Sequence, residues 1–451
     1  MENSKRNVLG SAPVNKLLVK FAVPSIISML VSALYNIVDQ LFIGRSVGTL
    51  GNAATNIVYP LSTSCVALAL LFGIGGASAF NIAMGEGKEK DAAHYIGNAA
   101  MMLVLSGLIL CIIVQLFTRH LLRFFGAPDD VMPYAVSYTY ITSFGFPFLV
   151  FATGGGHLIR ADGSPKYTMF CNLIGALINT ILDPIFIFVL KLGMAGAAIA
   201  TIIGQIVSGF LVLRYICNYK TVKLKRKYLK IEPRYTKKII SLGGSPFINQ
   251  IAMMTTQIIM NQSLAYYGSR SLYGESIPLA CSGIITKVNM IFFSIIIGIS
   301  QGLQPIASFN YGARKYDRVK SSYILAIKTA FIISIGAFIV FQIFPRQIIS
   351  LFGSGSQLYY EFGISYFRIF LFFTFLNFIQ PITSNFFTAV EKPVKGIFLS
   401  LTRQIIFLLP LIIILPLFIG IDGIMYSGPV SDFMAAVTGI FLVYFELKKF
   451  S

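Results

Sequence analysis

Charged residues are scarce in this chain. Only 12% of its 451 residues are charged, and acids are the rarer kind, with 17 Asp and Glu against 36 Lys and Arg. Soluble proteins carry roughly 25% charged residues. So few charges could not cover a water-facing surface, which excludes an ordinary soluble globular protein.

Histidine and cysteine are also few, at three and five residues, and tryptophan is absent. The cysteines stand singly along apolar stretches, so their spacing indicates neither a disulfide framework nor a metal site. Two glycine runs, Gly73–Gly76 and Gly154–Gly156, lack the strand–loop–helix context and the following Lys-Ser/Thr of a phosphate-binding loop. We therefore expect no nucleotide-driven pump, no cofactor and no enzymatic activity.

Apolar sequence, in contrast, is abundant: 56% of the residues are hydrophobic, and the mean hydropathy is +0.76. A helix needs about 20 apolar residues to cross a bilayer. Turn residues such as Gly85-Glu86-Gly87 divide the apolar sequence into segments. We predict an all-α integral membrane protein with twelve transmembrane helices, at 15–44, 51–79, 92–119, 133–158, 166–190, 193–217, 236–267, 276–307, 318–344, 359–385, 394–418 and 421–446.

Positive residues gather in every second break between these segments. The richest break runs from Arg214 to Lys238, whereas the alternate breaks hold mostly single cations such as Arg45 and Lys191. Cytoplasmic loops carry the excess of Lys and Arg in membrane proteins. We therefore expect both termini and the central break in the cytoplasm, in a multi-pass protein of the plasma (inner) membrane. The net charge of +19 then reflects topology, and we expect no nucleic-acid partner.

The two halves of the chain resemble each other. When Pro24 is placed over Pro246, Asp39 falls on Asn261, and the run 192–196 matches the run 419–423. Each half holds six predicted spans, an even number, so the repeat is parallel about an axis along the membrane normal. We predict an N-terminal six-helix lobe at 1–217, a basic cytoplasmic linker at 218–235 and a C-terminal six-helix lobe at 236–451.

Few charges fall inside the apolar segments, and charges there are costly enough to suggest function. From the helical rise, Asp39, Asp183 and Thr201 lie on the order of 8, 10 and 12 Å from the outer ends of their segments. Asn179 precedes Asp183 by four residues and shares its helix face. Pro184 removes a backbone donor and bends the helix at this point. The four polar side chains therefore come to a similar depth in the first lobe.

This set suits a small cation by either of two chemistries. Neighbouring buried carboxylates repel each other when both are ionised, so the pair can take up a proton. Alternatively, the oxygens of all four side chains could ligate a bare monovalent cation such as Na⁺. A third possibility is that the polar groups only satisfy one another between packed helices. The equivalent positions of the second lobe, which are Asn261 and apolar residues, argue against a purely structural role.

Further polar residues could line a substrate cavity. Tyr35 and Asn36 continue the first-lobe polar stripe one turn deeper, and Asn261 occupies the matching place in the second lobe. Gln205 of the first lobe is a further candidate for the cavity lining, and so is Asp432, which lies at the equivalent position of the second lobe, near the middle of its segment. There it could meet a cationic substrate or hydrogen-bond to a neighbouring helix.

Taken together, these motifs resemble the multidrug and toxic compound extrusion (MATE) family across nearly the whole chain. The resemblance rests on the segments 34–44 (LYNIVDQLFIG), 73–75 (GIG), 85–86 (GE), 160–163 (RADG), 179–184 (NTILDP) and 196–201 (GAAIAT). It implies a V-shaped pair of six-helix bundles that opens alternately to each side of the membrane.

The resemblance also implies antiport, with a drug or toxin leaving the cell as H⁺ or Na⁺ enters. In the prokaryotic members that the chain resembles, the positions matching Asp39, Asn179, Asp183 and Thr201 form the cation site of the first lobe. The position matching Pro24 is a proposed bend point of its helix.

We therefore expect a monomeric secondary antiporter that exports small organic, cationic compounds from within the lipid bilayer. One alternative is a lipid-linked oligosaccharide flippase of the same superfamily, although the acidic charges of the first lobe suit cations better than a pyrophosphate. The other is an intramembrane aspartyl protease with Asp39 and Asp183 as its dyad. The chain lacks the Gly-x-Gly-Asp-like context of such a protease.

Overall fold

The computed structural model describes residues 8–274, 276–352 and 355–450, which form helices and short connections without any β-strand. The ends of the predicted lobes, residues 1–7 and 451, lie outside these residues. Ten of the described helical segments are long and apolar enough to cross a membrane. A more polar helix, α10 (Pro233–Ser269), and a broken one, α14 (Gln357–Phe370) with α15 (Ile379–Ala389), complete the twelve crossings that the sequence predicts.

The first lobe contains six crossings. They are α3 (Val14–Val47), α4 (Thr49–Gly85), α5 (Glu89–Phe124), α6 (Met132–Thr142) continued by η1 (Ser143–Gly145) and α7 (Phe146–Ala161), α8 (Pro165–Pro184) continued by the π-helix η2 (Ile185–Val189), and α9 (Gly193–Cys217). A short helix, α2 (Val8–Ser11), precedes them.

The second lobe repeats this order. It consists of α10, α11 (Ser276–Gly312), α12 (Tyr316–Ile343), α14 with α15, α16 (Pro393–Leu401) continued by the π-helix η4 (Thr402–Leu408) and α17 (Leu409–Ile419), and α18 (Ile421–Leu447) with η5 (Lys448–Phe450). The short helix α13 (Pro345–Phe352) connects α12 to α14.

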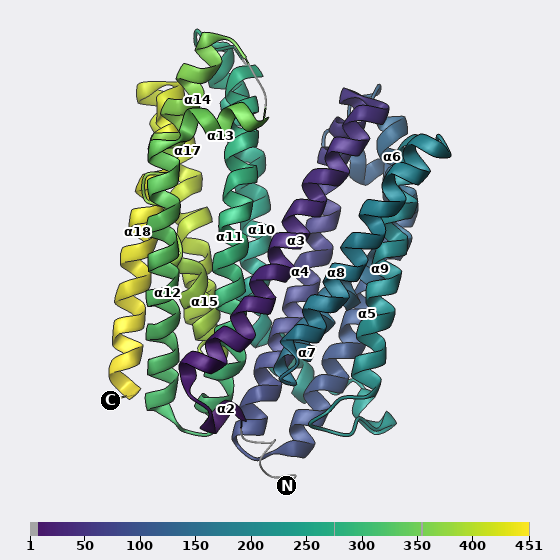
Figure 1. The fold of residues 1–451 in the computed structure, drawn as a ribbon, viewed down its shortest axis with the longest axis vertical. Coiled ribbons are helices and arrows are strands. Elements are labelled where there is room, and N and C mark those ends of the chain that lie inside the picture. Colours follow the sequence, from purple (N-terminus) through teal and green to yellow (C-terminus); the bar gives the residue numbers. More distant parts are fainter. Residues whose placement is uncertain (1–7, 275, 353–354, 451) are drawn as a thin grey trace.

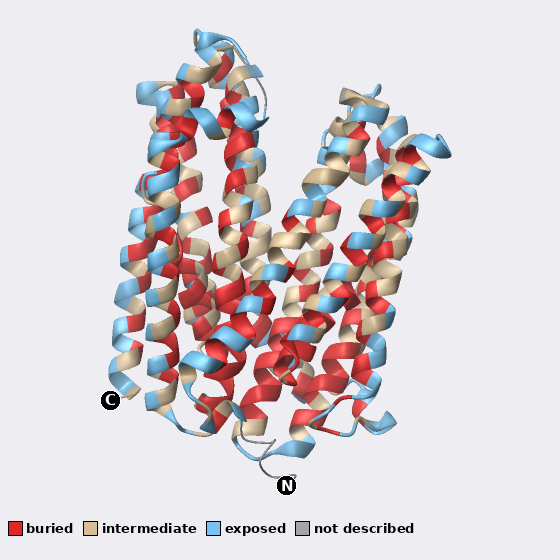
Figure 2. Cartoon of the chain, viewed as in Figure 1, coloured by how far each residue is buried: buried red, intermediate tan, exposed pale blue. Residues whose placement is uncertain are grey.

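The two lobes form a V (Figure 1). They meet at the end of the molecule that carries both chain termini, here called the terminal end, and diverge toward the opposite, open end. Buried residues are concentrated toward the terminal end, where the lobes converge (Figure 2). The contacts that join the lobes therefore lie on the side where the basic linker and both termini are found.

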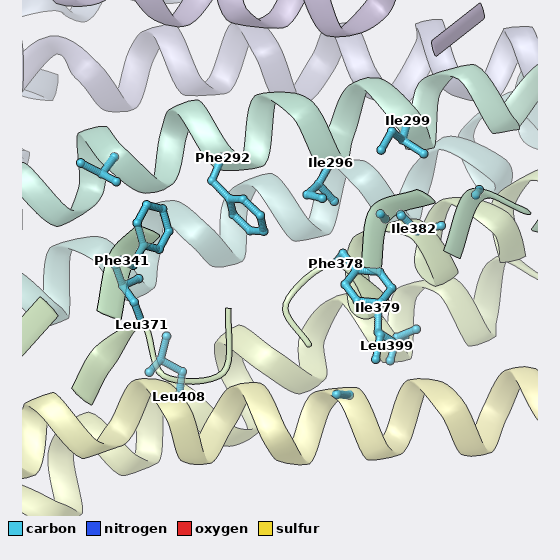
Figure 3. Close-up of a cluster of buried hydrophobic side chains, with 14 of the residues drawn as sticks. Phe292, Ile296, Ile299, Phe341, Leu371, Phe378, Ile379, Ile382, Leu399 and Leu408 are labelled. Carbon is cyan, nitrogen blue, oxygen red and sulfur yellow. The ribbon is translucent and has the colours of Figure 1, made fainter. Parts of the chain in front are cut away.

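Each lobe has its own hydrophobic core, but the lobes exchange the beginnings of their first helices. Leu17 and Phe21 of α3 belong to the core of the second lobe, and Ile239 and Leu242 of α10 belong to the core of the first. Figure 3 shows the second-lobe core, where Phe292 and Ile296 of α11 face side chains of the later helices. A division of the chain at 217 and 236 therefore does not follow the packing at the terminal end.

Glycines allow the lobes to approach closely at the terminal end. A Cβ on Gly85 of α4 would collide with the Phe309 carbonyl of α11, and one on Gly312 would collide with the Ile82 carbonyl of α4. Small residues permit this backbone-to-backbone packing in membranes. Nearby, the Gln304 amide of α11 donates to Ser78 of α4 at 2.8 Å. This contact joins the lobes by a buried hydrogen bond as well as by packing.

The linker between the lobes is folded back onto the first lobe. Asp162, between α7 and α8, accepts hydrogen bonds from the Tyr215 hydroxyl at 2.8 Å and from the backbone N–H groups of Lys220 and Thr221 at 2.8 and 3.0 Å. Burial raises the pKa of this carboxyl, although the hydrogen bonds oppose that effect. The Asn98 oxygen of α5 accepts from the Glu232 N–H at 2.8 Å. The linker is thus fixed at both of its ends.

Candidate functional site

The two first-lobe acids meet inside the lobe. Helices α3 and α8 pack together, and they bring Asp39 and Asp183 within hydrogen-bonding reach of each other. Asp183 is completely buried. Since two ionised carboxylates side by side repel each other, this arrangement favours a shared proton or a bound cation over two free charges.

An amide and a hydroxyl complete the cluster. The Asn179 amide donates to Oδ1 of Asp183 and to the Thr201 hydroxyl oxygen, both at 3.3 Å. Asn179 lies one turn before Asp183 on α8, and Thr201 lies on the adjacent helix α9. The Thr201 hydroxyl itself donates to the Ala197 carbonyl at 2.9 Å. The structure therefore brings together all four residues that the sequence placed at one depth.

Two carboxylate oxygens of this cluster have no protein partner. Oδ1 of Asp39 and Oδ2 of Asp183 are both buried without a hydrogen bond. Buried polar atoms are normally satisfied, so an unpartnered pair at one place is an exception that needs an explanation. A proton or a small cation between the acids would provide both oxygens with a partner. Among the described residues, no group of three or more His, Cys, Asp or Glu is placed to hold a metal ion.

Two tyrosines border the acids. Tyr35, on α3, is an electrostatic neighbour of both Asp39 and Asp183, as expected from its position in the polar stripe. Tyr138, on α6, is an electrostatic neighbour of the same acids and lies near Thr201. Sequence analysis missed Tyr138. Its only signal in the sequence is its place between Ser137 and Thr139 in an otherwise apolar segment.

The predicted bend at Pro184 coincides with irregular backbone. α8 ends at Pro184 and continues as the π-helix η2, whose wider turn follows from the missing proline N–H. Pro24 is buried inside α3, which is continuous from Val14 to Val47. Pro24 therefore lies within an unbroken helix, close to where α3 passes from the core of the second lobe toward the first.

The remaining cavity candidates are dispersed. Asn36 is exposed, and its amide donates to the Ser32 carbonyl at 2.7 Å. The Gln205 oxygen is buried without a partner, at the place where a Cβ on Gly145 would collide with it. Asn261 accepts from the Gln257 amide at 3.1 Å on the exposed side of α10. None of these three contacts the acidic cluster through a described hydrogen bond.

Asp432 lies in a different environment. Its carboxylate is only 1% exposed and accepts from Nε of Arg403 at 2.6 Å. Asn377, which lies in the break between α14 and α15, is a further neighbour of Asp432. The sequence leaves two roles open for Asp432, contact with a cationic substrate or a hydrogen bond to a neighbouring helix. The structure shows the second, since the Arg403 guanidinium already compensates the Asp432 charge.

Comparison with known proteins identifies the family. The MatE family model matches the chain twice, over residues 24–185 and 247–414. The chain belongs to the MATE family. Each match covers most of one lobe, which agrees with the internal repeat. The predicted membership of this transporter family is confirmed, and with it the all-α twelve-helix fold. A family of transporters also excludes the aspartyl protease.

Named relatives of this MATE protein are bacterial. A multidrug export protein MepA of Staphylococcus haemolyticus is 26% identical over 95% of the chain and 93% of its own length. A MepA of Staphylococcus aureus is 24% identical over 98% of the chain and 96% of its own length. Both alignments span the two lobes and the linker between them.

Solved structures share the fold. A transporter of the MOP superfamily from Pyrococcus furiosus superposes with a TM-score of 0.91 at 22% identity, over 99% of this chain and 98% of that one. A multidrug resistance MATE family transporter described in an outward-facing conformation also has a TM-score of 0.91, at 23% identity with the same coverage. The chain is thus a multi-pass membrane protein whose V-shaped arrangement has counterparts among MATE transporters.

Proposed function

We propose that this protein is a secondary antiporter that exports small organic, cationic compounds in exchange for H⁺ or Na⁺. The observation that carries the proposal is the contact between Asp39 and Asp183, which leaves one unpartnered buried oxygen on each acid. The named export function of the MepA relatives supports the transport class. The acidic residues of the first lobe do not support the flippase alternative in the same way, because the pyrophosphate of its substrate is an anion.

The proposed cycle uses the V shape. With the terminal end in the cytoplasm, as its basic linker favours, the lobes diverge toward the outside, in a plasma (inner) membrane. A proton or Na⁺ entering from outside binds at Asp39 and Asp183, with Asn179 and Thr201 as additional ligands or hydrogen-bonding partners. Substrate leaves from between the lobes, and the lobes then rock to the opposite opening. Coupling requires that the ion bind the two conformations with different affinity.

The test is export of a fluorescent cationic dye from proteoliposomes that contain the purified protein as a monomer. A pH or Na⁺ gradient is imposed, and the wild type is compared with Asp39→Asn and Asp183→Asn. Asp422→Asn is the matched control, because Asp422 is an exposed acid at the start of α18. We expect one gradient to drive export in the wild type and the control.

Both site variants should then bind dye but fail to respond to the gradient. The effective gradient identifies the ion. Export that is unchanged in both variants would place the coupling site elsewhere. Export that responds to neither gradient in the wild type would reject antiport and favour the flippase.

A further inference from the structure

Arg160 is a buried cation near the terminal end of the first lobe. It lies in the last turn of α7, and it is only 4% exposed. Two residues later, Asp162 is directed toward the linker, where its carboxylate accepts from Tyr215, Lys220 and Thr221. Arg160 and Asp162 therefore do not form an ion pair, although they are close in sequence and opposite in charge.

The Arg160 guanidinium has no counter-ion among the described residues. No carboxylate in the described ranges forms an ion pair with it or lies close enough to compensate its charge. The side chain makes no hydrogen bond to a described residue, although a guanidinium carries five N–H donors and stays protonated in proteins. A buried charge without a partner is strongly unfavourable. No Arg160 nitrogen is among the fully enclosed, unpartnered side-chain atoms, so the guanidinium is accessible to a small anion that would balance its charge.

The end of α7 does not provide that negative group. A helix C-terminus carries partial negative charge on its last carbonyls. Here those carbonyls already accept from the backbone: Leu158 from the Asp162 N–H, Ile159 from the Ser164 N–H, and Arg160 from the Gly163 N–H. The Tyr219 hydroxyl also donates to the Leu158 carbonyl, at 2.7 Å.

Two residues of the same helix, His157 and Gly156, lie beside the Arg160 guanidinium. His157 is 2% exposed, is an electrostatic neighbour of Arg160, and its Nδ1 has no hydrogen-bond partner. A Cβ on Gly156 would stand 3.0 Å from Cγ2 of Thr168, which is a tight contact, and 3.9 Å from Nη1 of Arg160. Gly156 thus has no side chain that would cover Nη1 of Arg160.

We propose that Arg160 and His157, beside Gly156, bind a small monovalent anion, chloride under cellular conditions. The guanidinium supplies the charge and several N–H donors, and Nδ1 of His157 can donate in its protonated tautomer. A monatomic ion suits this site better than a bulky organic anion, because Thr168 packs closely against Gly156. This site is separate from the cation cluster of Asp39 and Asp183, and it does not depend on the direction or substrate of transport.

The test measures thermal unfolding of the full-length protein in detergent, with chloride or gluconate as the sodium salt at constant ionic strength. Because the chain has no tryptophan, unfolding is followed with a fluorogenic maleimide that reacts when the buried Cys65, Cys171 and Cys281 become exposed. A ligand that binds only the folded state stabilises it. We expect the wild-type Tm to rise saturably with chloride and with bromide, and gluconate to have no effect.

Three variants make the test specific. Arg160→Gln should lose the chloride-dependent rise, whereas Arg214→Gln, which removes an exposed arginine, should keep it. Gly156→Asp places a carboxylate beside the guanidinium. This variant should be as stable in gluconate as the wild type is in chloride, and it should not respond to chloride.

A wild-type Tm that is equal in chloride and gluconate would overturn the proposal, and so would an unchanged chloride response in Arg160→Gln. If Arg160→Gln does not fold, Gly156→Asp decides the question. A persistent chloride response in Gly156→Asp would show that the anion binds elsewhere.

Discussion

The buried acids of this protein differ in what surrounds them. Asp183 contacts another carboxylate and the Asn179 amide, whereas Asp432 is paired with the Arg403 guanidinium. The first environment leaves a buried carboxylate oxygen of Asp183 without a partner, whereas the second pairs opposite charges. At the scale of single residues, the two lobes are therefore specialised differently despite their common fold.

Asn179 connects the acids to α9, so its removal should weaken ion binding. Asn179→Ala removes the hydrogen bonds to Asp183 and Thr201. A hydrogen bond to a charged group contributes about 1.5–3 kcal/mol, which corresponds to roughly a 10-fold or greater loss of affinity. We expect the concentration of the coupling ion that gives half-maximal dye export to rise by this factor.

The control for this measurement is Asn218→Ala, which removes an exposed amide bonded to the Arg214 carbonyl. It should leave the ion dependence of export unchanged. An Asn179→Ala protein with the wild-type ion dependence would contradict a role for Asn179 in the site.

The Arg403–Asp432 pair predicts a non-additive effect on stability. Asp432→Leu leaves the buried guanidinium without its partner, which should cost about 3–5 kcal/mol of unfolding free energy. Replacing both residues, as Arg403→Met with Asp432→Leu, removes both charges and should restore much of that loss. Denaturant unfolding of the purified proteins measures both values. A double variant no more stable than Asp432→Leu would contradict the pairing.

The principal site residues could be predicted because charge is so rare in the apolar segments. Asp39 and Asp183 are conspicuous for that reason, and the spacing of Asn179 places it on the same helix face as Asp183. Tyr138 could not be predicted in the same way, since 22 tyrosines are spread along the chain and a phenol is common in membrane helices. Its role depends on how α6 packs against α9, which the sequence pattern does not specify.

At the scale of elements, the linker behaves as part of the first lobe. The Asp162 carboxylate holds the beginning of the linker, and Asn98 holds its end. Between these points Lys223, Lys225 and Lys227 are exposed. The linker thus presents cleavable basic residues while its backbone is restrained at both ends.

Removing the first restraint should make the linker accessible to trypsin. Asp162→Ala eliminates several hydrogen bonds to a charged acceptor, and each such bond is worth about 1.5–3 kcal/mol, so local opening should increase about 10-fold or more. We expect faster cleavage after the linker lysines, measured by gel electrophoresis of protein in detergent. Asp130→Ala, at an exposed acid of the opposite end, should be cleaved at the wild-type rate.

The broken crossing of the second lobe shows where element prediction fails. The segment 359–385 reads as one continuous apolar span, but α14 ends at Phe370 and α15 begins at Ile379. Six of the eight residues between them are Leu or Phe, so hydropathy gives no sign of the break. Inside the membrane, irregular backbone is tolerated only where protein or water forms hydrogen bonds with its free N–H and C=O groups. Here the neighbouring Asn377 is buried beside the Arg403–Asp432 pair.

At the scale of the whole molecule, the two lobes exchange the beginnings of α3 and α10. The hydrophobic pattern identifies both helices but does not determine which lobe each end packs against. The exchange ties each lobe to the other at the terminal end, while the contacts of Gly85 and Gly312 bring α4 and α11 together there. The proposed rocking of the two lobes would have to separate the contacts that Gly85 and Gly312 make between α4 and α11.

A larger side chain at this contact should shift the lobes apart. Gly312→Val would place atoms against the Ile82 backbone of α4, so the closed terminal end should become less populated. Spin labels at Lys90→Cys and Ser321→Cys, in a background without the reactive native cysteines, report the distance between the lobes at this end. We expect a longer distance distribution in Gly312→Val.

Gly336→Val is the matched control, because a Cβ at Gly336 in α12 meets no atom within 4 Å. Its distance distribution should match that of the wild type. An unchanged distribution in Gly312→Val would show that the glycine contact does not hold the terminal end closed.

The most direct test of the account is ion movement driven by substrate. Proteoliposomes are loaded with the cationic dye and diluted into dye-free buffer, and uptake of H⁺ or Na⁺ is followed in the absence of any imposed ion gradient. The account predicts that outward dye movement drives uptake of one of these ions in the wild type and none in Asp39→Asn or Asp183→Asn. Dye export without ion uptake, or wild-type uptake in both variants, would contradict it.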